Sequence, residues 1–271
     1  MSLLHLLLSS INITSKLMDS LSLKALKNIP EINPGTDLVD LIIQNILTEE
    51  VKIKNGDIIV IAQKIVSKSE NRYKKLSEIK ASSHAKLLAT KVNKTAEFIQ
   101  IVLDESNTIL SFDNNILITE HKLGFTNINA GIDMSNIKDN QEQVLLLPED
   151  PNKSALRISN KISKELNLNI DIIISDSMTR PQRYGITGFA IGSSNINCLL
   201  DKRGSVDMFG NILSTTEIAI GDELASAASI LMGQCDEKQP IVLISGYKDN
   251  TDFTNSAKSL GLLKKDDIYR Y

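Results

Sequence analysis

The sequence predicts a soluble globular fold that combines helices with buried strands. Two β-branched runs, at residues 58–61 and 172–174, are apolar at every position, which is typical of strands buried on both faces. Other segments, such as residues 38–46, carry apolar residues at the three- and four-residue spacing of amphipathic helices. The chain has 271 residues, enough for one large or two small domains with a sizeable core.

Composition narrows the class of protein. Hydrophobic residues make up 42% and charged residues 23%, which is ordinary for a globular chain, and the formal net charge of -3 argues against a general nucleic-acid binder. The three histidines are scattered, which argues against a His-based zinc site. The two cysteines are too few for a disulfide scaffold, so we expect a reducing cytoplasm.

The N-terminus carries a leucine-rich run at residues 3–8. It is too short to span a membrane and lacks the preceding basic residues of a signal peptide. We therefore expect residues 1–20 to be an extension or a short helix. No later stretch is predicted to cross a bilayer, so no membrane partner is expected.

The first half of the chain begins with a predicted strand that tapers into a loop, because Pro30 cannot donate to a sheet. A helix follows, capped by Thr36 or Asp37 and ending near Thr48. Asn55 and Gly56 then form a turn before a buried strand. The predicted elements are a strand over 25–32, a helix to 48, a strand over 58–61, two helices over 82–104 broken near Asn93, and a hairpin over 108–119.

The second half alternates strands and helices in the same way. Ser154 is the expected cap of one helix, and Gly233 the expected end of another. The predicted elements are strands over 144–147, 172–174, 189–192 and 240–245, and helices over 154–166, within 215–232, and over 256–264.

The strand at residues 172–174 leads to the strongest candidate site. Asp176 and Ser177 follow it directly, and Arg180 and Arg183 stand on a Pro/Gly-punctuated loop just beyond. Asp and Ser offer hard oxygen ligands, while arginine holds phosphate or carboxylate oxygens in a planar fork. This pattern favours a site for a metal-bound polyphosphate. A strand that simply ends in an Asx or Ser turn explains the same residues equally well.

Two further segments carry candidate ligands. Lys68 follows the strand at residues 58–61, where α/β folds often bind ligands, although a lone lysine there is usually a solvated surface residue. Asp133 stands among small residues at 124–136, which suits a metal ligand or, more commonly, an Asx-rich turn. The sequence has no P-loop, no G-x-G-x-x-G and no nucleophile elbow, so any nucleotide must be bound by an unusual site.

Four motifs in one order resemble the coenzyme F420-0:L-glutamate ligase family. They are Ile65-Val66-Ser67-Lys68-Ser69-Glu70-x-Arg72, Asn129-Ala130-Gly131-Ile132-Asp133-x-Ser135-Asn136, Ser175-Asp176-Ser177 with Arg180-Pro181-x-Arg183, and Asp222-Glu223-Leu224-Ala225 with Leu231-Met232-Gly233-Gln234. The resemblance runs from about Leu21 to Tyr247, and four motifs in register are specific.

The resemblance implies an α+β fold with mixed and antiparallel sheets flanked by helices, in an intertwined homodimer. Residues 21–271 would form the ligase domain, as one unit or as two intertwined subdomains. The implied reaction adds L-glutamate through a γ-linked amide to F420-0, a phospholactyl-deazaflavin acceptor. The implied co-substrate is GTP, with Mn²⁺ or Mg²⁺ at two sites and K⁺ as a further candidate cation.

The resemblance also assigns residues. Asp133 and Asp176 resemble ligands of one metal, and Ser177 and Gln234 ligands of a second. We expect Asp133, Asp176, Arg180 and Arg183 to be the catalytic residues. The residues that resemble GTP-contacting positions are Ile29, Pro30, Glu31, Ile32, Gln63, Lys64, Lys68, Asn136, Met232, Gly233, Gln234, Cys235, Asp236, Glu237, Lys238 and Gln239.

The chain departs from the family pattern on the side expected to bind the acceptor, at Thr179, Gln182 and residues 208–211. Two alternatives therefore stay open. One is a related GTP-dependent amide ligase that acts on a different carboxylated metabolite. The other is a nucleotide-binding regulator without turnover.

Overall fold

A mixed central sheet organises the protein, seen here in a computed structural model that describes residues 20–113, 115–139, 141–248, 252–262 and 266–267. Within that part of the chain the strand order is β1-β12-β2-β8-β9. β2 and β8 are parallel, and the other neighbours are antiparallel. The strands are β1 (Ser22–Ala25), β2 (Asp57–Ala62), β8 (Ile170–Arg180), β9 (Arg183–Ser193) and β12 (Ile241–Ser245).

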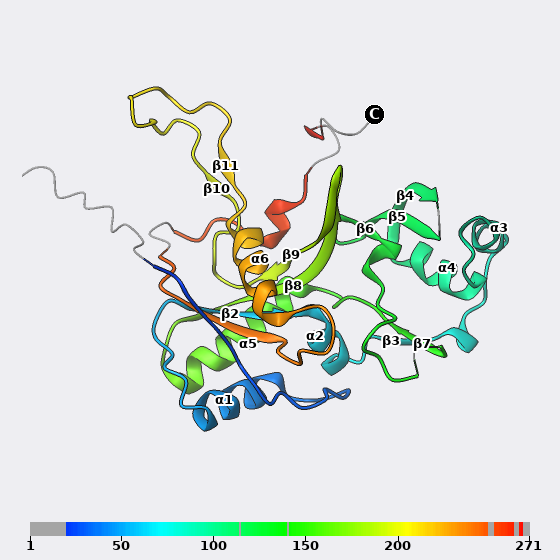
Figure 1. Cartoon of the computed structure of the whole chain (residues 1–271), viewed down its shortest axis with the longest axis horizontal. Coiled ribbons are helices and arrows are strands. Elements are labelled where there is room, and N and C mark those ends of the chain that lie inside the picture. The colour runs from blue at the N-terminus through cyan, green and yellow to red at the C-terminus, as the bar shows by residue number, and fades with distance from the viewer. Residues whose placement is uncertain (1–19, 114, 140, 249–251, 263–265, 268–271) are drawn as a thin grey trace, which may run out of the picture.

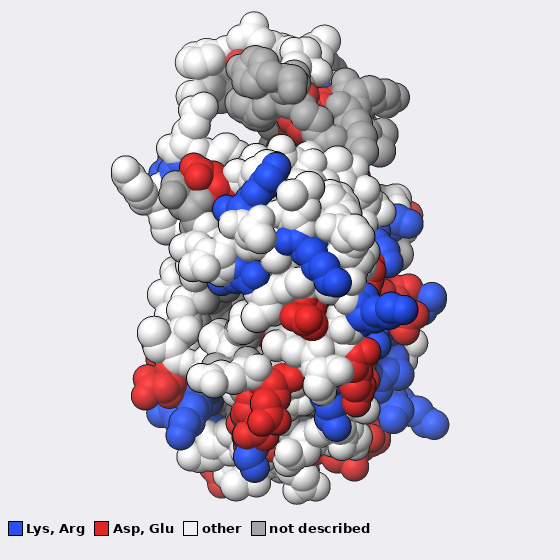
Figure 2. All heavy atoms as spheres, turned by 90° about the vertical axis from the view of Figure 1, so that its right-hand side faces the viewer, with Lys and Arg blue, Asp and Glu red and all other residues white. Residues whose placement is uncertain are grey.

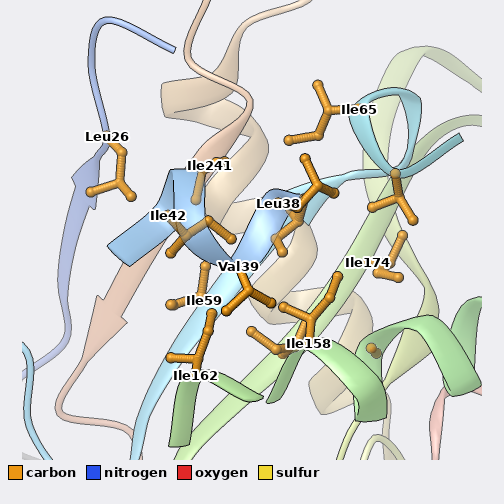
Figure 3. Close-up of a cluster of buried hydrophobic side chains, with 14 of the residues drawn as sticks. Leu26, Leu38, Val39, Ile42, Ile59, Ile65, Ile158, Ile162, Ile174 and Ile241 are labelled. Atoms are coloured by element: carbon orange, nitrogen blue, oxygen red, sulfur yellow. The ribbon is translucent and has the colours of Figure 1, made fainter. Parts of the chain in front are cut away.

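Helices cover both faces of this sheet (Figure 1). On one face, α1 (Leu38–Thr48) and α5 (Pro151–Leu166) bury side chains such as Ile42 and Ile158 against Ile59 and Ile174 (Figure 3). On the other, α6 (Ile220–Met232) packs Leu224 and the residues around it against the sheet. Each fully buried aliphatic side chain contributes roughly 1.5–3 kcal/mol, so this two-sided core is the main source of stability.

A third hydrophobic cluster supports the smaller region at the right of Figure 1. It joins α3 (Ser83–Val92), α4 (Ala96–Asp104) and the sheet of β4 (Ser106–Asp113), β5 (Ile116–His121) and β6 (Thr126–Ile128). β3 (Tyr73–Lys75) pairs with β7 (Gln143–Leu145) beside it. On the face of this region in Figure 2, acidic and basic side chains are interspersed among the described residues rather than separated by sign.

An arm projects from the molecule at β10 (Leu200–Asp201) and β11 (Glu217–Ile218), which pair with each other. Val206 and Ile212 form an isolated bridge farther along the arm. Met208 and Phe209 at its tip are 88% and 81% exposed. The arm therefore holds large apolar side chains away from the core.

Most predicted elements are confirmed, often with local detail. Asp37 caps α1, and its carboxylate accepts a hydrogen bond from Val39 N at 2.9 Å. Asn93 separates α3 from α4 with a left-handed φ of 46°. Gly233, with a φ of 69°, ends α6. The hairpin of β4 and β5 and the strands β2, β7 and β12 lie where apolar patterning places them.

Several predictions were wrong. The predicted strand at residues 25–32 ends at Ala25, because the chain turns at Asn28 with a φ of 55°. Asp150, rather than Ser154, caps α5; the Ser154 hydroxyl instead donates to Glu70 at 2.5 Å. In the predicted 256–264 helix only a 3-10 turn, Ala257–Leu260, forms among the described residues.

The stretch around Pro181 is also not a loop. β8 continues to Arg180 and returns as β9 through a tight turn in which Gln182 adopts a φ of 57°. The short strand predicted at residues 189–192 is therefore the end of an eleven-residue strand. A further helix, α2 (Gln63–Ser69), was not predicted; two short 3-10 turns, Leu76–Glu78 and Asn129–Gly131, complete the described elements.

The predicted N-terminal extension over residues 1–20 lies outside the described residues, except for Ser20. Among the described helices, none is long and apolar enough to cross a membrane.

Candidate functional site

A cavity of about 1030 Å³ lies where β2 stops and β8 continues. The two strands are paired as far as Ala62 and Ser175. Beyond that point the chain after β2 turns into α2, while β8 runs on to Arg180 paired with β9. Asp176 and Ser177 therefore stand at an edge of β8 that β2 leaves uncovered, and both line the cavity.

Asp133 reaches the same cavity from a different part of the chain. It follows the 3-10 turn at Asn129–Gly131 and is held by a two-bond bridge to Leu145, with N–O distances of 2.9 and 3.0 Å. Gly131 has a φ of 65°, and a Cβ there would lie 3.1 Å from the Leu147 side chain. This close approach explains why a small residue precedes the aspartate.

Two residues of α2 contact the Asp133 carboxylate. Gln63 Nε2 donates to Oδ2 at 2.5 Å, and Lys64 Nζ lies 3.0 Å from Oδ1. Ser67 Oγ donates to Gln63 Oε1 at 2.9 Å, which orients the amide so that its nitrogen points to Asp133. Asp133 is thus bound by one neutral and one cationic donor.

The two carboxylates have raised pKa values. Burial is the main cause for both. For Asp176 the negative charge of Asp133 adds to the effect, and the pKa rises to about 7. Asn127 Nδ2 donates to Asp176 Oδ2 at 3.3 Å, while the Ser177 backbone N–H, the charge of Lys64 and the Gln63 amide offset part of the rise in pKa. Two shielded carboxylates whose pKa values are both raised form a site where a cation would be stabilised.

The remaining oxygen donors fit a divalent cation bound jointly with substrate. Ser177 Oγ donates to Gln234 Oε1 at 2.9 Å, so these two side chains are in direct contact where they line the cavity. In the described part of the chain, no group of three or more His, Cys, Asp or Glu side chains could hold a metal. The protein therefore offers two carboxylates and neutral oxygens, a donor set that waters or phosphate oxygens would have to complete.

Lys68 lies on the same helix as Lys64 and faces the same cavity. Its side chain is only 6% exposed and forms an ion pair with Glu31, which is 71% exposed. Burial and, to a lesser extent, the negative charge of Glu31 raise the pKa of Tyr73, which also lines the cavity. A buried ammonium next to an apolar loop suits the phosphates of a nucleotide.

The loop after α6 closes another side of the cavity. Asn136 Nδ2 donates to the Cys235 carbonyl at 3.0 Å, which ties this loop to the segment that carries Asp133. Cys235 N donates in turn to Glu237 Oε2 at 2.8 Å. Cys235 is a free, exposed cysteine.

The structure brings together nearly all of the predicted site residues. The lining includes Ile29, Pro30, Glu31, Ile32, Gln63, Lys64, Lys68, Asp133, Asn136, Asp176, Ser177, Met232, Gly233, Gln234, Cys235, Asp236, Glu237, Lys238 and Gln239. Of the predicted catalytic residues, Arg180 and Arg183 lie instead at the hairpin tip and do not line it. Arg180 Nε is buried and has no hydrogen-bond partner among the described residues.

Sequence reasoning missed some residues that shape the site. Asn127 and Ser67 each fix a side chain that faces the cavity. Both belong to stretches singled out by their motifs, but nothing in one sequence distinguishes them from ordinary turn or helix residues. The residues that depart from the family pattern lie in different places. Thr179 lines the cavity, whereas Met208 and Phe209 lie on the arm.

The sequence model of a family described as F420-0:Gamma-glutamyl ligase matches residues 27–246. The chain belongs to this family. Three relatives named coenzyme F420:L-glutamate ligase are similar over most of their length. That of Methanocaldococcus jannaschii is 41% identical over 83% of this chain and 88% of its own. The Methanothermobacter thermautotrophicus protein is 38% identical over 84% and 89%, and the Halorubrum lacusprofundi protein 36% over 84% and 88%.

Proposed function

We propose that this member of the family is a GTP- and divalent-metal-dependent ligase that joins L-glutamate to coenzyme F420-0. The observation that carries the proposal is the meeting of Asp133 and Asp176 with Lys64 and Lys68 in one cavity. Its support from the comparisons is the family and the names of the relatives.

The chemistry explains why such a site needs a nucleotide. A carboxylate and an amine do not condense unaided in water, because oxide is a poor leaving group and the amine is mostly protonated. In our proposal the acceptor carboxylate attacks the γ-phosphorus of GTP, GDP leaves, and an acyl phosphate forms. The deprotonated amine of glutamate then attacks the acyl carbon, and inorganic phosphate leaves as the amide forms.

In this proposal the residues of the cavity have different roles. Lys68 and Lys64 would bind phosphate oxygens, while residues 29–32 and the loop over 233–239 would flank the nucleotide. Asp133 and Asp176 would hold one divalent cation, Mn²⁺ or Mg²⁺, and Ser177 and Gln234 a second. When bound, such cations neutralise phosphate charge and align the in-line displacement. A K⁺ ion is a further candidate near the phosphates.

We also propose that the chain works as an intertwined homodimer. The arm beyond β10 exposes four large apolar side chains, those of Val206, Met208, Phe209 and Ile212, at 64% to 88%. Contiguous exposed apolar groups on a projecting segment are typical of a protein interface. Sedimentation of the wild type against a Met208→Ser/Phe209→Ser variant tests this, because the variant should shift toward monomer and an unshifted variant would remove the arm from the interface.

Product analysis tests the proposed reaction. The full chain is incubated with GTP, Mn²⁺ or Mg²⁺, glutamate and F420-0, and the products are read by mass spectrometry. We expect F420-0 to gain one or more glutamyl residues, with one GDP and one phosphate released per addition. Omission of the metal or replacement of GTP by a non-hydrolysable analogue should abolish the gain.

The same assay separates the alternatives. Thr179, which departs from the family pattern, lines the cavity, and this favours a different carboxylated acceptor as the second candidate. In that case F420-0 would stay unchanged while another carboxylate supports phosphate release. GTP binding without phosphate release, whatever the acceptor, would identify a regulator without turnover.

A further inference from the structure

The ammonium group of Lys64 has more hydrogen-bond partners than that of an ordinary surface lysine. Its Nζ lies 3.0 Å from Asp133 Oδ1, and it donates to the Ser135 carbonyl at 2.9 Å and to Ser135 Oγ at 3.2 Å. An ammonium group has three donors, and three oxygens surround this one. The side chains of Lys64 and Asp133 are only 22% and 21% exposed, so solvent screens the pair incompletely.

The same contacts block the metal site proposed above. Lys64 occupies Oδ1 of Asp133, and Gln63 Nε2 occupies Oδ2. A cation that binds this carboxylate must displace at least one of the two donors. Displacing Gln63 alone would leave a divalent cation beside an ammonium, and like charges at such a distance in a shielded cavity repel strongly.

The ammonium group of a displaced Lys64 could move toward the part of the cavity that Lys68 lines. Its flexible four-carbon stem starts one helical turn before Lys68 on α2, and both lysines line the same cavity. A polyphosphate bound along this face would give both ammonium groups new anionic partners. The two lysines have different partners in this structure, since Lys68 pairs with Glu31 rather than with Asp133.

We propose that Lys64 is an exchangeable counter-cation of Asp133, which a divalent cation displaces and a nucleotide phosphate receives. The proposal rests on the GTP- and metal-dependent function proposed above and adds a positioning residue to it. Lys64 would make metal binding weak without nucleotide, because the metal must first break the ion pair. With nucleotide present the ammonium moves to phosphate, and Asp133 becomes available.

Calorimetric titration of Mn²⁺ into the nucleotide-free full chain tests this exchange. We expect Lys64→Met to bind Mn²⁺ about tenfold more tightly than the wild type, within the usual range of coupling between sites. The gain in Mn²⁺ affinity on adding a non-hydrolysable GTP analogue should shrink by the same factor. Lys64→Arg, which keeps the charge, should retain the weak binding of the wild type.

Lys68→Met is the matched control, since it removes the same charge from the same helix but leaves the Asp133 pair intact. Its Mn²⁺ affinity without nucleotide should rise by less than about threefold, below the usual range of such couplings. Unchanged or weaker Mn²⁺ binding by Lys64→Met, or an equal gain in both variants, would overturn the exchange. Circular dichroism and a second variant, Lys64→Gln, guard against a misfolded protein.

The results of these titrations and of the product assay distinguish a failure of the exchange from a failure of the proposed function. A wild type that glutamylates F420-0, together with a Lys64→Met affinity equal to that of the wild type, would refute the exchange and leave the function standing. A wild type that binds no Mn²⁺ even with the GTP analogue would refute the metal-dependent function, and the exchange with it.

Discussion

Asp133 and Asp176 face one cavity, but the chain holds them in different ways. Asp133 lies outside any described strand, fixed by the Leu145 bridge, and its carboxylate is bound by Gln63 and Lys64 at 2.5 and 3.0 Å. Asp176 lies inside β8, and its carboxylate accepts a longer hydrogen bond, of 3.3 Å, from Asn127. One carboxylate is thus paired with a cation, and the other mainly with a neutral amide.

The difference shows where the site lacks positive charge. Burial raises the pKa of both carboxylates. The ammonium of Lys64 offsets part of this rise at Asp133, whereas the charge of Asp133 adds to it at Asp176, whose pKa rises to about 7. A carboxylate so destabilised gains most from a nearby cation. The Asp133 side is therefore partly compensated by the protein itself, and in the proposed function an added cation would stabilise the Asp176 side more.

Neutralising either carboxylate should give the largest effect and so tests whether the two sides share one metal. We expect Asp133→Asn and Asp176→Asn to lower turnover by more than about a hundredfold, since even the partners of metal ligands are typically worth ten- to a hundredfold. Asp40→Asn, on the exposed side of α1, is the control and should be fully active. Turnover assays measure the activity of each variant, and thermal melts measure its stability. Wild-type activity with metal still required, in either variant, would exclude that residue from the metal site.

The pH dependence of stability should separate the two carboxylates. The pKa of Asp176 is about 7 in the folded protein against a usual 3.8, so the folded state binds more protons than the unfolded state between these values. Stability from this group is therefore highest below pH 4 and falls as the pH rises to 7, by roughly 4 kcal/mol at most. Asp176→Asn should remove this fall.

Urea unfolding between pH 4.5 and 8, in chelator, measures the effect. Asp133→Asn provides the comparison, because it removes one cause of the raised Asp176 pKa and should shift the fall to lower pH. Parallel pH profiles for the wild type and Asp176→Asn would show that Asp176 has an ordinary pKa.

The smallest expected effect is on the nucleotide side. Lys68→Ala should weaken GTP binding by about tenfold while changing glutamate binding little, because the phosphate would lose a buried ammonium partner. Lys74→Ala, an exposed lysine of β3 outside the cavity, serves as the control. Fluorescence titrations with each ligand measure both affinities. Equal losses for GTP and glutamate would indicate damaged folding instead.

The central strands could be predicted because their sequences have few alternatives. Ile58–Ile61 and Ile172–Ile174 are apolar at consecutive positions, and only burial on both faces accommodates such runs. Caps such as Asp37 could also be predicted, since their side chains act on the next few residues. The extent of β8 could not, because Asp176 to Arg180 stays in the sheet through its pairing with β9, a tertiary effect.

For the site residues, too, what depends on local sequence could be predicted and what depends on tertiary packing could not. The motifs identified segments that do meet at the cavity, but their contacts depend on where the segments pack. Nothing near Lys64 in the sequence indicates a contact with Asp133, which is far along the chain, and the α2 helix that carries Lys64 was not predicted. Arg180 and Arg183 illustrate the opposite case, because proximity in sequence to Asp176 did not bring them into the cavity lining.

The proposed sharing of metal between protein and nucleotide is tested most directly by titrating Mn²⁺ into the wild type with and without a non-hydrolysable GTP analogue. The protein supplies two carboxylates, one of them paired with Lys64, so the phosphates must provide the remaining negative charge. We predict that the analogue strengthens Mn²⁺ binding at least about tenfold, and that Mn²⁺ strengthens analogue binding by the same factor. Tight Mn²⁺ binding at two sites in the nucleotide-free protein, unchanged by the analogue, would contradict the shared site.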